Sequence, residues 1–150
     1  MAAPNVNIDW GAGKITRGDW RNIKKLLLQY DIRTLLEFGS GLSTEMFDLE
    51  PQLERIVSMD ILRWHVERMK IALPRVQFIL YKKNEVPEIS EKFDMVFVDG
   101  PAGSRFYELT TANRVATKVI FCHDWARGQD RVMLDERWKT ISKNKVFACI

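Results

Sequence analysis

The sequence has few cysteines and no long hydrophobic run. Cys122 and Cys149 are the two cysteines among 150 residues, and both lie within apolar segments. This placement favours buried, unreactive thiols over a disulfide framework or a metal pair. No apolar run approaches the about 18 residues that a membrane-spanning helix needs, and no basic segment followed by an apolar one marks a secretion signal. We therefore expect a soluble, cytoplasmic protein.

A strong excess of charge of one sign is also lacking. The net charge is +3, from 23 basic and 20 acidic residues, which is too small to predict a nucleic-acid partner. The phosphate-binding pattern Gly-x-x-x-x-Gly-Lys-Ser/Thr is absent as well, which argues against a nucleotide triphosphate site of that type. Internal repeats, low-complexity tracts and linkers are not found, so the length predicts one domain.

Hydrophobic residues make up 46% of the chain, enough for a packed core. We expect residues 1–16 to form an N-terminal arm and residues 17–150 to form the domain. Apolar runs predict strands at 34–38, 55–60, 76–80, 93–98, 118–122 and 145–150. Helical spacing and capping signals predict helices at 17–30, 43–49, 61–72, 104–116 and 128–141. This alternation, with strands apolar on both faces, predicts an α/β fold: a Rossmann-like, doubly wound and mostly parallel sheet of about six strands with helices on both faces.

A glycine turn follows the first expected strand. Glu37 ends an apolar run and is followed by Phe38-Gly39-Ser40-Gly41 and then by a Ser-Thr pair able to open a helix. Glycines allow such a turn to approach a ligand closely. Asp60 ends the second expected strand at about the 20-residue distance that places an acid on a ribose hydroxyl in a βαβ unit. The pattern therefore predicts a site for a nucleoside-containing cofactor.

Four of the expected strands end in an acidic residue. Besides Glu37 and Asp60, Asp99 follows the fourth strand and His123-Asp124 follows the fifth. In a doubly wound sheet, ligands bind beyond the carboxyl ends of the strands, so these side chains share one edge. Such an edge suits a cation, a ribose or a substrate hydroxyl better than a bare phosphate.

Taken together, these motifs resemble those of the class I S-adenosylmethionine-dependent methyltransferases, over about residues 17–150. The run 36–41 is similar to the first motif of that family, Asp60 to its ribose-binding acid, and 93–99 to its fourth-strand motif. The combination of 98–103 with 121–127 is similar to a branch with small O-methyltransferases and glucuronoxylan 4-O-methyltransferase-like proteins. The resemblance implies S-adenosylmethionine as cofactor and O-methylation of a small molecule or sugar hydroxyl.

The resemblance also implies roles for individual residues. The cofactor-binding candidates are Glu37, Gly39, Ser40, Gly41, Ser43, Thr44, Asp60, Ile61, Asn84 and Asp99. The catalytic candidates are Asp99, His123 and Asp124. Asp99 would orient the substrate hydroxyl, act as a base, or bind Mg²⁺ or Mn²⁺ together with Asp124; His123 is the alternative base. These alternatives stay open at the level of sequence, and His65 is expected to be a surface residue.

One feature of the chain leaves another interpretation open. The seventh, antiparallel strand that the family usually adds is apparently missing, which would expose a sheet edge. A second copy of the chain in a homodimer, or the N-terminal arm, would cover that edge, and a non-catalytic or partner-dependent module is the main alternative function. A nicotinamide-dinucleotide protein is disfavoured because Thr44 stands where its fingerprint needs Gly or Ala. Methylation of a nucleic-acid base is also disfavoured, because no Asn/Asp-Pro-Pro-Tyr/Phe motif is present.

Overall fold

The computed structural model describes residues 15–85, 88–123, 134–142 and 146–149. Its described elements form an α/β fold built on one seven-stranded sheet with the order β3-β2-β1-β4-β5-β7-β6. The strands are β1 (Thr34–Phe38), β2 (Arg55–Asp60), β3 (Gln77–Leu80), β4 (Phe93–Val98), β5 (Ala116–Cys122), β6 (Trp138–Ser142) and β7 (Val146–Cys149). The first five are parallel, whereas β7 pairs antiparallel with both β5 and β6. The chain order reverses between β1 and β4, and ligands bind at such a switch point in open α/β sheets.

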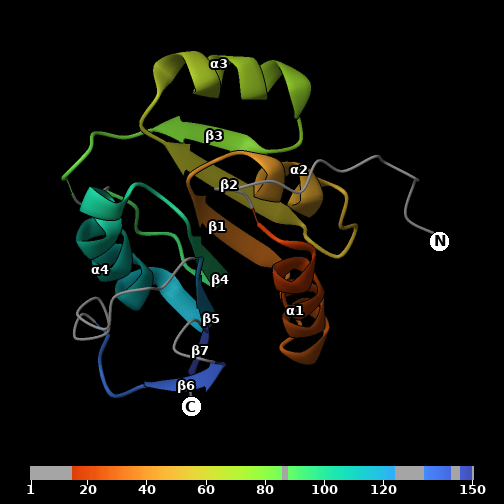
Figure 1. Cartoon of the computed structure of the whole chain (residues 1–150), viewed down its shortest axis with the longest axis vertical. Helices are drawn as coiled ribbons and strands as arrows, with labels where there is room; N and C mark the ends of the chain where they lie inside the picture. The colour runs from red at the N-terminus through yellow and green to blue at the C-terminus, as the bar shows by residue number, and fades with distance from the viewer. Residues whose placement is uncertain (1–14, 86–87, 124–133, 143–145, 150) are drawn as a thin grey trace.

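Helices cover both faces of the sheet, as the sequence predicts (Figure 1). The helices are α1 (Arg17–Gln29), α2 (Leu42–Asp48), α3 (Arg63–Ala72) and α4 (Arg105–Val115), the last preceded by a 3₁₀ turn at Ala102–Ser104. Side chains of α1, α2 and α3 share one buried cluster with one face of the strands. Side chains of α4 belong to the cluster on the other face. The doubly wound fold class is thus confirmed.

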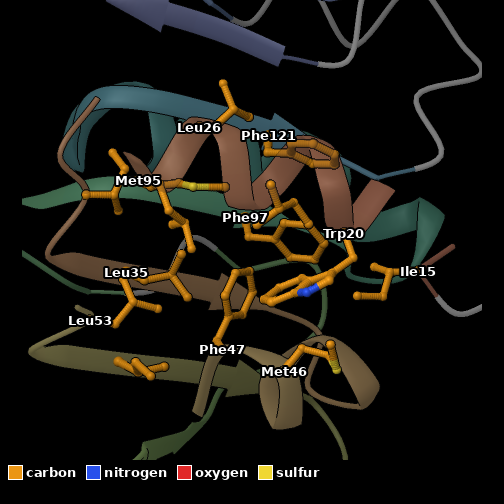
Figure 2. Close-up of a cluster of buried hydrophobic side chains, with 14 of the residues drawn as sticks. Ile15, Trp20, Leu26, Leu35, Met46, Phe47, Leu53, Met95, Phe97 and Phe121 are labelled. Atoms are coloured by element: carbon orange, nitrogen blue, oxygen red, sulfur yellow. The ribbon is translucent and has the colours of Figure 1, made fainter. Parts of the chain in front are cut away.

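Aromatic side chains fix α1 against the sheet. Trp20 of α1 meets Phe47 of α2 edge-on, with ring centroids 5.6 Å apart, and Phe47 meets Phe97 of β4 at 5.5 Å (Figure 2). Phe97 stacks on Phe121 of β5 at 5.3 Å. Each such pair contributes about 1 kcal/mol beyond its buried area. The cluster therefore anchors the first turn of α1, where Asp19 precedes Trp20, beside the ends of β4 and β5.

The start of α1 forms as predicted from its capping signal. The hydroxyl of Thr16 accepts a hydrogen bond from the backbone N–H of Asp19 at 3.0 Å, and the Asp19 carboxylate accepts one from the N–H of Thr16 at 3.1 Å. This reciprocal arrangement satisfies two of the otherwise unpaired amides of the first turn. Ile15, expected in the N-terminal arm, is buried in the core instead.

The C-terminal prediction needs correction. The helix expected at 128–141 is wrong for its last part, because Trp138–Ser142 is strand β6; residues 128–133 lie outside the described part. Trp138 is buried against the α4 face of the sheet, whereas Lys139 and Ile141 are exposed. The spacing of Leu134, Trp138 and Ile141 suits a helix, but in the strand Trp138 and Ile141, three residues apart, lie on opposite faces of the sheet, so the helical spacing was misleading.

The seventh strand is present, so its predicted absence is also wrong. The segment 146–149, expected as a sixth strand, is the antiparallel β7, which lies between β5 and β6 and pairs with both. The exposed ladder on which the homodimer prediction was based is therefore covered within the chain, and the homodimer stays a prediction. Within the described residues, no helix combines the length and the apolar character needed to cross a membrane.

Candidate cofactor and acceptor site

A cavity of about 410 Å³ opens at the carboxyl ends of the central strands. Five of the residues that line it were predicted from the sequence: Gly39, Ser40, Asp60, Ile61 and Asp99. Five more were not in the predicted set: Leu62, Tyr81, Gly100, Pro101 and Arg105. The turns after β1, β2 and β4 thus meet around one space, as parallel strands that end at one edge require.

Gly39 is needed where the turn after β1 crosses the turn after β4. Its φ is +87°, which favours glycine, and a Cβ at this position would lie 2.4 Å from the carbonyl oxygen of Asp99. No side chain fits against backbone at that distance. The close crossing brings Ser40 and Asp99 to the same cavity.

Ser40 is tied to Asp60 and to α3. Its backbone N–H and its hydroxyl donate to Asp60 Oδ2 at 3.0 and 2.8 Å, while Asp60 Oδ1 accepts from the N–H of Leu62 at 3.0 Å. The Ser40 carbonyl lies 3.0 Å from His65 Nε2, and because a carbonyl only accepts, His65 carries its proton on that nitrogen. His65 was expected at the surface but is half-buried. These bonds pre-organise the predicted ribose acid before any ligand arrives.

Glu37 lies beneath the glycine turn rather than at the cavity. It is fully buried and accepts hydrogen bonds from the hydroxyls of Ser43, Thr44 and Ser58, the last at 2.7 Å. Burial raises its pKa to about 7, although the three hydroxyls act in the opposite direction. Gly41 donates its N–H to Thr44 Oγ1 at 2.9 Å. Three predicted cofactor residues, Glu37, Ser43 and Thr44, therefore support the turn from below. Neither they nor Gly41 line the cavity.

Asp99 and His123 meet at the ends of β4 and β5, as the sequence predicts. Asp99 Oδ1 lies 2.9 Å from His123 Nδ1. The other ring nitrogen, Nε2, lies 3.2 Å from Oδ2 of Asp19, the capping residue of α1. His123 is 2% exposed and does not line the cavity, whereas Asp99 does.

Two predictions about this edge remain open. Asp124 lies outside the described residues, and among the residues described no group of three or more His, Cys, Asp or Glu side chains is arranged to hold a metal ion. The Asp99–Asp124 metal site stays a prediction. Asn84 is exposed, has φ +63°, and does not line the cavity, so its contact with adenine also stays a prediction.

Helix α4 holds the turn after β4 from behind. Oε1 of Glu108 accepts the N–H of Gly100 at 2.9 Å, and Nε of Arg105 donates to the carbonyl of Gly100 at 3.0 Å. Arg105 also donates to the carbonyl of His123, and so joins the ends of β4 and β5. Glu108 is fully buried, and burial raises its pKa to about 7. Burial likewise raises the pKa of the Tyr81 hydroxyl.

Glu108 and Tyr81 are not among the site residues predicted from the sequence. Glu108 lies in the first turn of α4 with no motif around it. Gly100 hints at a close neighbour, because a Cβ at that position would lie 2.2 Å from Glu108 Oε1. Tyr81 directly follows β3, a position that strand-end reasoning could have found.

Solved structures share this architecture. An O-methyltransferase from Bacillus cereus in complex with SAH is 16% identical, with a TM-score of 0.67 over 93% of this chain and 84% of that chain. A TehB-like SAM-dependent methyltransferase from Corynebacterium glutamicum is 13% identical, with a TM-score of 0.58 over 88% of this chain and 92% of that chain. The SAM-bound amino pentose methyltransferase CalS10 from Micromonospora echinaspora is 15% identical, with a TM-score of 0.60 over 78% and 54%.

The fold is that of the class I S-adenosylmethionine-dependent methyltransferases. No model of a known protein family matches the sequence, and neither does any curated protein. The chain spans 62% of the methyltransferase domain of bacterial CtHen1, another structure with this methyltransferase fold. At these identities the likeness concerns the fold, and the activity has to be argued from the site itself.

Proposed function

We propose that this chain binds S-adenosylmethionine in the cavity at the strand ends and methylates an oxygen of a small molecule or a sugar. The observation on which this depends is the pairing of Ser40 with Asp60 across the cavity wall. It holds a carboxylate at the position where the resemblance expects the ribose hydroxyls. A carboxylate has about four lone-pair sites, and three hydrogen bonds to Asp60 are described, so capacity remains for a ribose hydroxyl.

The charges of the cavity support this cofactor over a dinucleotide. Among the described residues, Asp60 and Asp99 line it together with one basic side chain, Arg105, whose guanidinium already donates to two backbone carbonyls. A diphosphate would face two carboxylates there, which is unfavourable. A sulfonium cofactor with a net positive charge is complementary to the same walls.

The chain's own groups would act mainly by position. When bound, S-adenosylmethionine would supply an electrophilic methyl group: in-line attack of the acceptor oxygen on the methyl carbon breaks the bond from methyl to sulfur, S-adenosylhomocysteine leaves, and the hydroxyl proton is released. Such a reaction needs the acceptor held at near-attack distance. Asp99 lines the cavity and can accept a hydrogen bond from the acceptor hydroxyl, and Gly39 allows the two turns to close around the reacting groups.

Isothermal titration with S-adenosylmethionine, S-adenosylhomocysteine (SAH) and NAD tests the proposal. We expect both sulfur compounds to bind and NAD not to bind. Asp60→Asn, which keeps the shape but removes the charge, should weaken SAH binding about tenfold through the loss of charge-assisted hydrogen bonds.

Glu54→Gln is the matched control for that variant. Glu54 precedes the amino end of the same strand β2 and forms an exposed ion pair with Arg33. Glu54→Gln makes the same change of charge as Asp60→Asn at the opposite end of the strand and should leave the affinity for SAH unchanged. Binding of NAD alone would favour a dinucleotide protein. Binding of no compound by a folded protein would favour the non-catalytic module.

A further inference from the structure

A buried chain of three side chains connects α1 to the wall of the cavity. Asp19 Oδ2 lies 3.2 Å from His123 Nε2, and His123 Nδ1 lies 2.9 Å from Asp99 Oδ1. Asp19 and His123 are 8% and 2% exposed. Asp99, at the other end of the chain, lines the cavity. A residue 80 positions away in the sequence from Asp99 therefore acts on it through one imidazole ring.

The geometry gives His123 two acceptors and no opening to the cavity. Both ring nitrogens face carboxylate oxygens: a neutral ring donates from one of them, and an imidazolium donates from both. The ring is also held in place, because it stacks on Phe97 with centroids 6.3 Å apart. A group engaged in this way is suited to fix the orientation of a neighbour rather than to take a proton from a ligand.

Asp99 is held on one of its two oxygens. His123 Nδ1 contacts Oδ1, and Nη2 of Arg105 lies 3.7 Å from the same atom. Among the contacts described, Oδ2 is then the atom that can accept from a hydroxyl or an ammonium group in the cavity. Restraint of one oxygen determines the direction in which the other points.

We propose that Asp19 is a positioning residue that acts through His123 to aim the Asp99 carboxylate at the methyl-transfer position. The inference rests on the proposed function, since it assumes that the cofactor's sulfur lies beside Asp99. It gives His123 a positioning role in place of the base considered from the sequence. It also gives the capping acid of α1 a second task, which the hydrogen bond from Thr16 does not explain.

Sinefungin is a probe for this arrangement that needs no acceptor. It is an analogue of S-adenosylmethionine that carries an ammonium group where the transferring methyl lies, whereas SAH has nothing there. If Asp99 is aimed at this position, sinefungin should bind about tenfold more tightly than SAH, the effect expected of a charge-assisted hydrogen bond. The ratio of the two dissociation constants reports the aim of Asp99 and not the integrity of the rest of the site.

Four variants separate positioning from structure. Asp99→Asn should abolish the preference for sinefungin, and Asp19→Asn should reduce it at least threefold. His123→Asn retains a donor near Asp99 but loses the link to Asp19, so Asp19→Asn should have no further effect in that background. Thr16→Ala is the matched control: it damages the same capping box and leaves the Asp19 carboxylate in place, so the ratio should not change. Thermal melting of each variant verifies that it is folded.

The outcomes are distinguishable. If SAH does not bind, the proposed function fails and the inference fails with it. If SAH binds but sinefungin has no preference, or if the preference survives Asp19→Asn, the proposed function stands and the positioning role is overturned. A loss of preference in Thr16→Ala equal to that in Asp19→Asn would assign the effect to the helix end and would also overturn it.

Discussion

Two glycine turns at the same edge of the sheet are each supported by a buried glutamate, but in different ways. Beneath the turn after β1, Glu37 accepts from three hydroxyls. Behind the turn after β4, Glu108 Oε1 accepts from the N–H of Gly100, and Oε2 has no hydrogen-bond partner among the described residues. Burial raises the pKa of both to about 7.

The two glycines also differ in the atoms that lie against them. Gly39 faces backbone, the carbonyl of Asp99, whereas Gly100 faces the end of the Glu108 side chain. The backbone of Asp99 is held by the hydrogen bond from its N–H to the carbonyl of Phe38, whereas the Glu108 side chain can change its rotamer. A side chain at position 39 would therefore strain backbone, and one at position 100 would displace a side chain.

Gly39→Ala should have the largest effect on stability. The new methyl group meets the carbonyl of Asp99 at 2.4 Å, and the residue must keep a φ of +87°. We expect a loss of about 4 kcal/mol in the free energy of unfolding, from backbone strain and overpacking together. Urea unfolding measures it. Gly41→Ala is the control, because no atom lies within 4 Å of a Cβ there; an equal loss in both variants would contradict the argument.

The two glutamates should make stability fall as the pH rises. Each carboxyl has an ordinary pKa of 4.5 and a folded value of about 7, so the folded state binds the proton more tightly. The stabilisation is complete below pH 4.5 and is lost as the pH rises through 7, by up to about 3 kcal/mol for each group.

Glu108→Gln and Glu37→Gln separate the two contributions. Each variant should lose its share of the fall in unfolding free energy between pH 4.5 and pH 8, measured by urea unfolding at several pH values. We expect the unfolding free energy of both variants to depend less on pH than that of the wild type. A wild-type curve that rises over this interval would show that neither carboxyl is protonated in the folded protein.

The turn after β1 was also the more predictable one from the sequence. Gly39, Ser40 and Asp60 were found because a strand, a glycine turn and an acid about 20 residues later form a local pattern. The roles of Glu37, Ser43 and Thr44 were less accurate, because the same pattern does not distinguish a side chain at the cavity from one beneath it. The side chain of Glu37 lies under the turn, within reach of the hydroxyls at the start of α2.

The turn after β4 depends on contacts that no local pattern contains. Glu108 reaches Gly100 from the first turn of α4, and Asp19 reaches His123 across 104 residues. Strand β6 was missed for a related reason: its pairing with β7, not its own spacing, decides between helix and strand. Long-range hydrogen bonds of this kind are a consequence of topology and are not written in residue spacing.

Gly100→Ala should cost less than Gly39→Ala and should be rescued. A Cβ would lie 2.2 Å from Glu108 Oε1 and 2.5 Å from its Cδ, so the Glu108 side chain has to change its rotamer, at a cost of about 2 kcal/mol in unfolding free energy. In a Glu108→Ala background the same substitution should cost less than half as much. A double-mutant cycle measures this coupling; additive effects would mean that Gly100 is constrained by something other than Glu108.

The smallest effects should come from the hydroxyls around the two glutamates. Ser58→Ala removes one of the three donors to Glu37 and should cost about 1 kcal/mol. It should also raise the Glu37 pKa further, because this hydrogen bond lowers it. Ser104→Ala removes a buried hydroxyl for which the described residues provide no partner, so it should be neutral or slightly stabilising. Urea unfolding of both variants measures the two losses. Equal losses would mean that the Ser58 hydroxyl contributes by packing and not by its hydrogen bond to Glu37. The turn after β1 would then not differ from the turn after β4 in this respect.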